Sequence, residues 1–313
     1  MIQTVDKVEI TVLVDNYTDL LRSDSGRGMT RPLVPYGKVL LAEHALSLFV
    51  TARSGEKSFS FLMDAGGSEI SLFHNAALLG VDMGSVSALI ISHGHDDHTG
   101  AVTGILDRCP SLPVYVHPAA FSRRQKRLPT RPVCPAPPPD RAAWEGAGAG
   151  IRDTSGPTGI WEDRILVTGG IDRVIPFEQG NPVYEIEEGG GFVHDPFPDD
   201  QAVILSLRGA GLVILSGCAH AGIINTVEYA RKITGIPRVH AIIGGFHLSG
   251  SFFGSRIPET VRALSAYDPS LVVPLHCTGW EAIHACMQEM PDRVVLNTVG
   301  SSYLLGDPGL PSP

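Results

Sequence analysis

The chain has 313 residues, of which 43% are hydrophobic and 18% are charged, and its formal net charge is −9. So few charged residues beside so many apolar ones exclude a coiled coil and general disorder, because such a chain can bury a large core. The negative charge excludes a global basic field for nucleic acid, and the longest apolar runs fall short of the roughly 20 residues of a membrane helix.

The cysteine content and the first residues bear on the cellular compartment. The chain has five Cys, which is an odd number and too few for a disulfide scaffold. A reducing compartment is the simpler interpretation. The first ten residues include Asp6, Lys7 and Glu9, so they lack the apolar run of a secretory signal peptide. We expect a cytoplasmic protein without a membrane partner.

Short β-rich runs dominate the first hundred residues. They are rich in β-branched and aromatic residues and end at Gly, Asp, Asn or His, which is typical of strands closed by turns. The predicted strands cover 8–14, 46–52, 59–63 and 88–92, and helices are expected over 71–79 and 99–108.

The second half alternates strands and helices more regularly. The helix expected over 223–234 should stop at Gly235, which is followed by Pro237. The other predicted helices cover 258–266 and 280–289, and the predicted strands cover 202–207, 212–216, 239–243, 271–275, 293–299 and 303–305. We therefore predict two β-sheets with helices on their outer faces, an α+β arrangement.

Residues 122–164 have a different composition. Six of the eleven residues over 129–139 are Pro, and Gly alternates with Ala over 146–150. Because Pro cannot donate to a strand ladder, we expect an irregular insertion within a single domain that spans 1–313. Arg123 and Arg124 begin a basic run at its start. They either clamp a phosphorylated substrate or form a solvated loop face.

The strongest chemical signal is a cluster of four potential metal ligands directly after the predicted strand 88–92. It reads His93-x-His95-x-Asp97-His98. In an extended loop, His93 and His95 can point to the same side. Asp97 and His98 follow where a helix begins, and a carboxylate is favoured at a helix amino terminus. Imidazole and carboxylate are the ligands expected for Zn²⁺, Fe²⁺ or Mn²⁺, and Zn²⁺ is the first candidate.

Further histidines follow other predicted strands. His220, His247 and His276 each come within a few residues of an apolar run. Strand ends at one edge of a sandwich converge in space, so these side chains are candidates to complete a site for one or two divalent ions. Taken singly, each could be an ordinary hydrogen-bonded residue at a strand end.

These residues, in this order, resemble the motifs of the metallo-β-lactamase superfamily. The resemblance extends along most of the chain. Flanking motifs resemble a branch described as metal-dependent hydrolases of β-lactamase superfamily II, which includes proteins called dihydropterin-methyl-ribofuranosylaminobenzene-phosphate synthases. The motifs that carry it are Asp64-Ala-Gly66, Leu13-Val-Asp-Asn16, Ala42-Glu-His44, Ser216-Gly-Cys-Ala-His-Ala-Gly-Ile-Ile-Asn225, Gly244-Gly-Phe-His-Leu248 and His276-Cys-Thr-Gly279.

The resemblance implies an αββα sandwich with a metal site at one edge of the sheets. It implies one metal on His93, His95 and His220, and a second on Asp97, His98 and His276. A bridging hydroxide would then be the nucleophile. Asp64 would hold the ligand loop through hydrogen bonds.

One position departs from the family pattern. Most members carry a bridging Asp after the strand that corresponds to 239–243, whereas this chain continues Gly244-Gly245-Phe246-His247. Three alternatives remain open: His247 substitutes, the bridge is hydroxide alone, or the second site is weak. We expect a partly occupied or labile second site, and we expect Asp97 and His247 to take part in catalysis.

Other residues are candidates for the substrate pocket. Asp15, Asn16 and His44 lie at strand ends within the resembling motifs, although Asp-Asn is also a common turn pair. Cys218 and Cys277 flank the histidine positions and are either soft ligands or small core residues. Residues 249–255 are expected to form a mobile loop over the site.

The first functional hypothesis is a metal-dependent hydrolase that attacks an ester, phosphodiester or related bond of a small, phosphorylated or unphosphorylated substrate. The second is a transferase that condenses a dihydropterin pyrophosphate with a ribofuranosylaminobenzene phosphate, as the branch name implies. The third is a protein that binds a ligand without catalysis. Nucleic acid is not an expected partner, because the only basic run is short.

Overall fold

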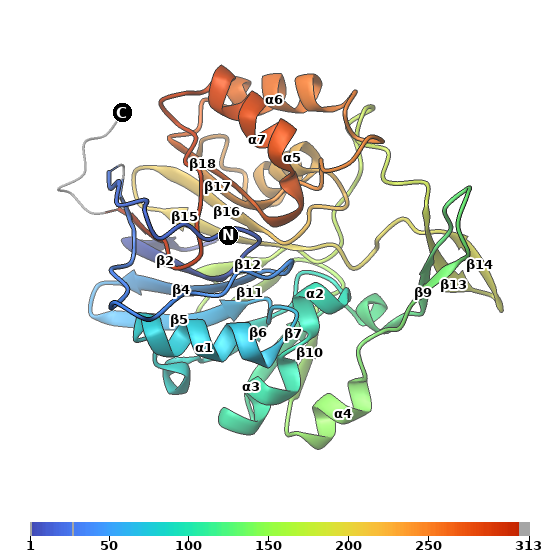
Figure 1. Cartoon of the computed structure of the whole chain (residues 1–313), viewed down its shortest axis with the longest axis horizontal. Helices are drawn as coiled ribbons and strands as arrows, with labels where there is room; N and C mark the ends of the chain where they lie inside the picture. Colours follow the sequence, from blue (N-terminus) through green and yellow to red (C-terminus); the bar gives the residue numbers. More distant parts are fainter. Residues whose placement is uncertain (1, 27, 307–313) are drawn as a thin grey trace.

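The structure, a computed structural model, describes residues 2–26 and 28–306. Within them, two large β-sheets pack face to face, and helices cover the outer face of each sheet (Figure 1). This arrangement confirms the predicted αββα sandwich. Among the described residues, no helix combines the length and the apolar character needed to cross a membrane.

The first large sheet has eight strands, most of them from the first half of the chain. In spatial order they are β10 (Gly150–Asp153), β7 (Pro113–Val116), β6 (Ala88–Ile90), β5 (Lys57–Met63), β4 (Ser47–Ser54), β2 (Lys7–Val14), β19 (Ser302–Leu305) and β3 (Met29–Thr30). Helices α1 (Glu69–Leu79) and α3 (Val102–Arg108) cover its outer face, and α2 (Asp96–Thr99) precedes α3.

The second large sheet has seven strands. In spatial order they are β11 (Thr158–Ile160), β12 (Ile165–Val167), β15 (Ala202–Leu207), β16 (Gly211–Ser216), β17 (Val239–Gly245) and β18 (Leu271–Leu275), and β1 (Thr4–Val5) also pairs with β15. Its outer face is covered by α5 (Ile223–Thr234), α6 (Ile257–Ala266) and α7 (Trp280–Glu289). Strands β16, β17 and β18 are mutually parallel, so their carboxyl ends meet at one edge.

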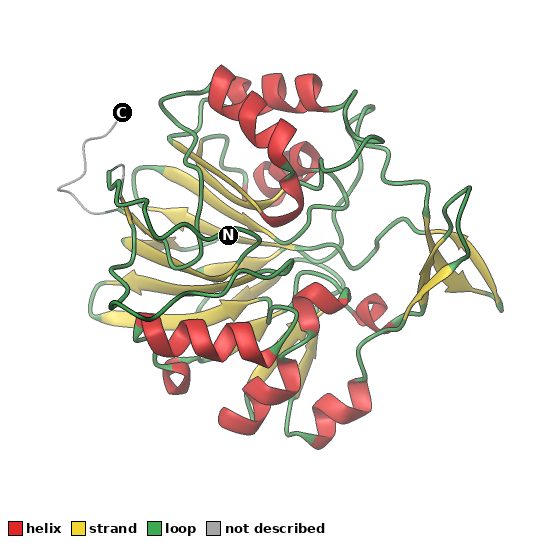
Figure 2. Ribbon diagram, viewed as in Figure 1, coloured by secondary structure: helices red, strands yellow, loops and turns green. Residues whose placement is uncertain are grey.

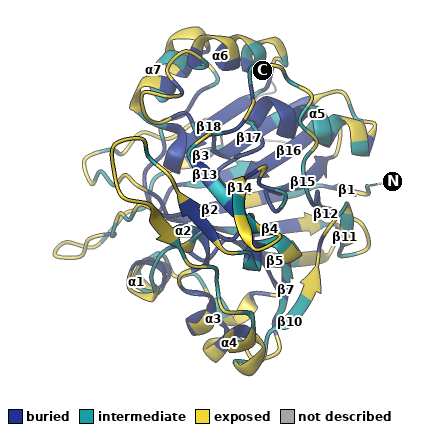
Figure 3. Cartoon of the chain, turned by 90° about the vertical axis from the view of Figure 1, so that its right-hand side faces the viewer, coloured by how far each residue is buried: buried dark blue, intermediate teal, exposed yellow. Residues whose placement is uncertain are grey.

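Each sheet is covered on both faces, by the other sheet and by helices, and its strands are therefore largely apolar. Every residue of β15 and β18 is buried, which explains why these strands are continuous apolar runs rather than alternating ones. Val50, Phe61, Leu205 and Ile243 contribute to the core between the two sheets. The interior strands are accordingly the most buried part of the chain (Figure 3).

The prediction of an irregular segment over 122–164 was wrong. The segment holds β8 (Arg124–Lys126), β9 (Cys134–Ala136) and helix α4 (Arg141–Gly146), and it ends in β10 and β11 of the large sheets. With β13 (Tyr184–Glu188) and β14 (Gly191–His194), strands β8 and β9 form a separate four-stranded sheet beside the sandwich (Figure 2). Proline is tolerated there because Pro135 lies in β9, an edge strand that needs fewer donors.

The strand predicted over 293–299 was also wrong. Val294 forms an isolated bridge with Val272, and regular pairing resumes only in β19. In the irregular segment that follows, the Asn297 side chain donates a hydrogen bond to the Asp15 carboxylate at 2.7 Å. The other long helices and strands lie within a few residues of their predicted positions.

Candidate metal centre

The candidate ligands lie on loops that follow three strands. His93, His95, Asp97 and His98 follow β6 or lie in α2, His220 follows β16, and His276 begins a short 3-10 helix directly after β18. The site therefore takes ligands from both large sheets. This is the sheet-edge position that the sequence predicted.

Three imidazoles converge in what we call the first cluster, His93, His95 and His220. His93 Nε2 lies 3.0 Å from His95 Nδ1, and His220 Nε2 lies 3.2 Å and 3.3 Å from these two atoms. Burial lowers the pKa of each of the three side chains, so the rings are neutral. A neutral imidazole has one ring nitrogen without a proton, so three rings that converge can offer lone pairs to a shared cation.

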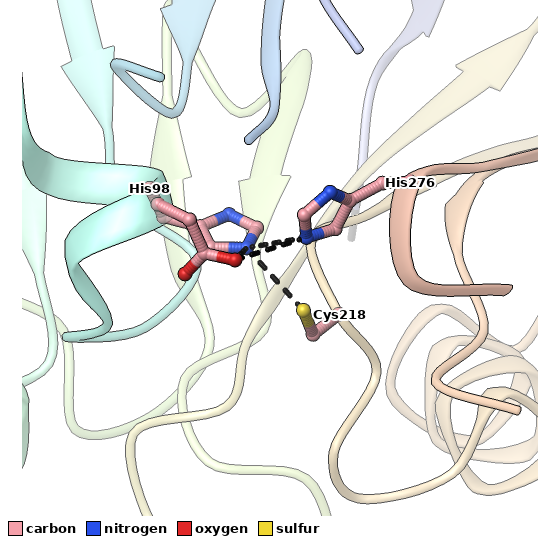
Figure 4. Close-up of side chains that lie close together, drawn as sticks. His98, Cys218 and His276 are labelled. Carbon is pink, nitrogen blue, oxygen red and sulfur yellow. Dashed lines mark hydrogen bonds and ion pairs between the residues drawn. The ribbon is translucent and has the colours of Figure 1, made fainter. Parts of the chain in front are cut away.

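The second cluster is Asp97, His98 and His276. His276 Nε2 lies 3.2 Å from His98 Nε2 and 3.3 Å from Asp97 Oδ2. The Cys218 Sγ atom approaches His98 Nε2 to 3.3 Å (Figure 4). Imidazole, carboxylate and thiol donors within this distance form a set that divalent transition metals bind.

Asp64 fixes the orientation of His98. Its Oδ2 atom accepts hydrogen bonds from His98 Nδ1 at 2.7 Å and from Ser92 Oγ at 2.8 Å, and Oδ1 accepts from the Ser92 backbone N–H. The proton of His98 therefore lies on Nδ1, and Nε2 faces the second cluster. This contact agrees with the role that was expected for Asp64.

The charge around His98 favours a cation. Burial acts to lower the pKa of His98, but the carboxylates of Asp64 and Asp97 outweigh burial and raise the pKa to about 9. The same two negative charges that stabilise a proton on this ring would also stabilise a divalent ion beside it.

Asp15 and Asn16 position His276. Asp15 is buried and accepts hydrogen bonds from the backbone N–H groups of Asn16 and His276 and from the Asn297 side chain. The Asn16 amide donates to the His276 carbonyl at 2.8 Å, and its oxygen lies 3.2 Å from His276 Nδ1. Both residues therefore support the His276 loop. Asn16 is exposed, and both residues line a cavity together with His276, so their assignment to substrate binding stays a prediction.

His44 lies at the open side of the second cluster. Its side chain is 72% exposed, its Nε2 atom is 4.0 Å from Asp97 Oδ2, and its ring centroid is 5.0 Å from that of His276. A side chain that is exposed and close to the cluster can still contact a substrate, so its assignment to the pocket stays a prediction.

Both predicted arginines are paired with carboxylates, although Arg124 lines the same cavity as His95. Arg124 is buried and donates from Nε to Asp195 at 2.7 Å, and it also pairs with Asp199. Arg123 lies at the surface and pairs with Glu187 at 3.1 Å. The proposed phosphate clamp by these two residues is not what the structure shows, because β8 directs Arg124 into a buried ion-pair network.

An exposed cation near the first cluster is Lys126, at the end of β8. Its Nζ atom lies 5.0 Å from the Tyr184 ring centroid, and that ring lies 5.6 Å from the His95 ring. A cavity of about 170 Å³ is lined by His95, Arg124, Lys126 and residues 134–138. Sequence reasoning missed Tyr184, because nothing in its flanking sequence links it to the histidines.

Phe197 and two aspartates support the first cluster. The Phe197 ring is stacked on His220, with ring centroids 4.0 Å apart and an interplanar angle of 2°. Asp199 accepts a hydrogen bond from the Gly94 backbone N–H, and Asp200 accepts one from Ala221. These contacts hold both ligand loops in place. The only sign of them in the sequence is the position of the two aspartates just before β15.

His247 lies beside the first cluster. Its ring centroid is 4.2 Å from that of His220, and its buried Nδ1 atom has no hydrogen-bond partner among the described residues. Its donor atom groups with the thiols of Cys218 and Cys277 rather than with the second cluster. A catalytic role for His247 stays a prediction.

Comparisons with known proteins agree with this geometry. The sequence model described as "Metallo-beta-lactamase superfamily" matches residues 55–220, more than half of the chain. A protein of Methanocaldococcus jannaschii named 7,8-dihydropterin-6-methyl-4-(beta-D-ribofuranosyl)-aminobenzene-5'-phosphate synthase is 27% identical over 303 residues, covering 92% of this chain and 93% of its own length. An uncharacterized protein of the same organism is 26% identical over 249 residues, which cover 79% of this chain and 88% of that protein.

Two solved structures share the fold. The first is Tm1679, described as a metal-dependent hydrolase of the beta-lactamase superfamily, with a TM-score of 0.75 and 24% identity over 96% of this chain and 100% of the other. The second is the metallo-beta-lactamase fold protein YhfI from Bacillus subtilis, with a TM-score of 0.50 and 12% identity over 95% and 99% of the two chains.

Proposed function

Because this chain belongs to the metallo-beta-lactamase superfamily, we propose that it is a metal-dependent hydrolase that cleaves an ester, phosphodiester or related bond of a small anionic substrate. The observation that carries the proposal is the convergence of two three-residue clusters at one sheet edge. The third hypothesis of the sequence analysis, a binding protein without catalysis, requires no such set of convergent donors.

The residues present fit two divalent ions. His93, His95 and His220 would hold one, and Asp97, His98 and His276 would hold the other, with Zn²⁺ as the first candidate. When bound, such ions polarise the scissile bond and lower the pKa of a coordinated water, which supplies the nucleophile.

The protein's own residues orient this chemistry. Asp64 holds His98, and Asp15 holds the His276 backbone, so both rings present Nε2 to the second cluster. Phe197 and Tyr184 pack on the histidines of the first cluster and exclude water from it. Lys126 places a positive charge at the mouth of the site, where it would bind an anionic group of the substrate.

The test compares metal content and hydrolysis in three proteins. We expect wild-type protein to hold about two equivalents of metal by elemental mass spectrometry, and to cleave at least one member of an ester and phosphodiester panel. His93→Ala should lose metal and hydrolysis. His284→Ala, which removes an exposed histidine on α7, should lose neither. Wild-type turnover by His93→Ala would overturn the proposal, and metal binding without any turnover would support the binding-protein hypothesis.

A second candidate is the transferase named by the Methanocaldococcus relative, which aligns with 92% of this chain. Such an enzyme would join a dihydropterin pyrophosphate to a ribofuranosylaminobenzene phosphate. Incubation with both compounds, followed by mass spectrometry, separates the two candidates. A joined product together with released pyrophosphate would favour the transferase, whereas a hydrolysed pterin that forms without the second compound would favour the hydrolase.

A further inference from the structure

An apolar cavity lies beside the second cluster. It has a volume of about 180 Å³, and its walls come from the segment after β2, the end of β18, the start of α7 and the segment before β19. His276 also lines it, so the cavity and the second cluster share one wall. Most of the other lining side chains are apolar or aromatic, and they are Tyr17, Pro274, Leu275, Trp280, Ile283 and Leu296.

Two aromatic side chains of this cavity are exposed to solvent. Trp280, the first residue of α7, is 63% exposed, and Tyr17 is 37% exposed. Their ring centroids lie 6.4 Å apart, with an interplanar angle of 43°. Tryptophan is highly buried on average, so an exposed tryptophan paired with a second aromatic ring at a cavity is typical of a ligand site.

Tyr17 is held in place by the protein itself. Its hydroxyl group donates a hydrogen bond to the Asp19 carboxylate at 2.9 Å, and its backbone carbonyl accepts one from the Val299 N–H at 2.8 Å. A ring that is already fixed loses little conformational freedom when a ligand packs on it. This arrangement favours binding at the cavity.

The polar groups of the cavity wall are hydrogen bonded to one another. Asp15 accepts from the Asn297 side chain and from the backbone N–H groups of Asn16 and His276. The Asn16 amide donates to the His276 carbonyl at 2.8 Å, and the Asn297 oxygen accepts from the Tyr303 hydroxyl at 2.9 Å. A polar ligand would compete with these bonds, whereas an apolar ring would leave them intact.

The volume of the cavity suits one aromatic ring. An apolar cavity of about 150 Å³ is enough to bind benzene. This cavity is slightly larger, at about 180 Å³. A flat ring inside it would meet the rings of Tyr17 and Trp280, and aromatic rings attract one another in offset or edge-to-face contacts.

We propose that this cavity binds an aromatic ring of the substrate, with Tyr17 and Trp280 as specificity-determining residues. The inference rests on the proposed function and narrows its substrate class. His276 of the second cluster lines this cavity, while His95 of the first cluster lines the cavity that contains Lys126. The bond to be cleaved would therefore lie over the clusters, between a ring at Trp280 and an anionic group at Lys126. Hydrolysis would transfer a water hydroxyl to the acyl or phosphoryl centre and release the ring as part of an alcohol.

The first experiment compares substrates that differ in a single group. Zinc-loaded protein is assayed with the benzyl, cyclohexylmethyl and methyl monoesters of succinate and with the matching phosphodiesters. We expect wild type to have a KM for the benzyl compound about 10–100-fold below that for the methyl compound, because the cavity buries the ring. The cyclohexylmethyl compound, which is apolar but not flat, should lie between them.

Variants assign this preference to the aromatic pair. Trp280→Ala should remove the difference in KM between the benzyl and methyl compounds, and Trp280→Phe, which keeps a ring, should restore it. Ile70→Ala removes an apolar side chain of α1 that is also exposed, so it is the matched control and should keep the wild-type preference.

The second experiment measures binding without turnover, with benzylphosphonate and methylphosphonate as probes. Of the three tryptophans, Trp144 is buried and Trp161 is stacked on Phe59, so Trp280 is the one that reports on the cavity. Benzylphosphonate should change the tryptophan fluorescence of zinc-loaded wild type at concentrations about 10–100-fold below those of methylphosphonate. Tyr17→Ala keeps this reporter and should bind benzylphosphonate more weakly, and calorimetry gives the corresponding affinities of Trp280→Ala.

The two experiments separate this inference from the proposed function. Equal affinity of wild type for the two phosphonates, or an unchanged preference in both Trp280→Ala and Tyr17→Ala, would overturn the aromatic site while leaving the hydrolase in place. A preference for benzylphosphonate that depends on Trp280, without cleavage of any compound, would support the aromatic site and count against the hydrolase.

Discussion

At the scale of single residues, Asp64 connects a proposed ligand, His98, to the loop that follows β6. It is fully buried, has a backbone φ of 62°, and accepts hydrogen bonds from Ser92 and His98. Asn tolerates this backbone conformation and has the same shape, so Asp64→Asn changes the charge and one acceptor with little strain.

We expect Asp64→Asn to weaken metal affinity by about 10–100-fold, because the partner of a ligating histidine sets both its orientation and its basicity. Competition against a chromophoric chelator measures the change. Asp107→Asn, at an exposed position of α3, is the matched control and should bind metal as wild type does. Equal affinities of Asp64→Asn and wild type would show that His98 does not depend on this contact.

Lys126 gives the second prediction at this scale. Lys126→Gln should raise KM for an anionic substrate by about 10–100-fold with a small change in kcat, since a hydrogen bond to a charged group contributes about 1.5–3 kcal/mol. Arg123→Gln should leave KM unchanged, because Arg123 pairs with Glu187 at the surface. Steady-state kinetics of both variants on the best substrate of the panel measures these KM values. A raised KM in Arg123→Gln together with an unchanged KM in Lys126→Gln would instead favour the arginine clamp expected from the sequence.

The sequence predicts the proposed ligands and one of their supports, Asp64, but not the aromatic and basic residues beside them. His93, His95, Asp97 and His98 form a contiguous motif, whereas Tyr184 and Lys126 meet only through the pairing of β8 with β13. The sequence leaves two alternatives open for Cys218, a soft ligand or a small core residue. The residue is buried, but the direction of its sulfur depends on tertiary structure that sequence spacing does not define.

At the scale of elements, the amino terminus of α5 is capped from outside the helix. Glu178 accepts hydrogen bonds from the backbone N–H groups of Ile224 and Asn225 at 2.9 Å and 2.7 Å. The residue before the helix must be Gly222, with φ of 104°, because a Cβ atom there would lie 2.1 Å from the Glu178 carboxylate. This cap holds the helix that follows the His220 loop.

Glu178 should make stability depend on pH. Burial outweighs the two backbone hydrogen bonds and raises the pKa of Glu178 from 4.5 to about 7. Between these values the folded protein keeps a proton that the unfolded chain has lost. The free energy of unfolding therefore falls as pH rises across this window, by on the order of 3 kcal/mol.

Urea unfolding of wild type and Glu178→Gln at pH 5 and pH 8 measures this effect. The variant carries no titrating group at this position, so the stability difference between the two proteins should change in favour of the variant as pH rises. A difference that stays constant between the two pH values would show that the Glu178 pKa is not raised.

The helices and strands that have a clear local sequence pattern could be predicted. The strands that form only by pairing with a distant segment of the chain could not. Helix α5 was expected over 223–234 and has those bounds, because Gly235 in a left-handed conformation ends it. The four-stranded sheet was missed because its strands come from residues 124–136 and 184–194. Neither segment has an apolar face long enough to indicate a strand by itself.

At the scale of the whole molecule, the metal centre joins the two large sheets. Four proposed ligands follow β6 of the eight-stranded sheet, while His220 and His276 follow β16 and β18 of the seven-stranded sheet. We propose that both sheets form one domain, as expected from the sequence. Bound metal should then stabilise the packing of one sheet on the other.

Removal of metal should therefore lower the melting temperature of the entire chain. Saturation at 100 to 1,000 times Kd would stabilise the folded state by about 2.7–4.1 kcal/mol. Calorimetry of loaded and chelator-treated protein measures the shift, and a single transition in both states is expected. In His276→Ala the shift should be reduced, because the seven-stranded sheet then loses one of its two ligands. Two separate transitions, of which only one responds to metal, would contradict the single-domain proposal.

The division of the ligands between distant parts of the chain has a consequence for biosynthesis. While a ribosome makes this protein, the four ligands of residues 93–98 emerge long before His220, and His276 emerges last. On the proposed assignment, the ligand set of the first ion is complete only after residue 220 has emerged, and that of the second only after residue 276. The second ion is therefore acquired when the chain is nearly finished, so cellular zinc supply would affect its maturation more than its synthesis.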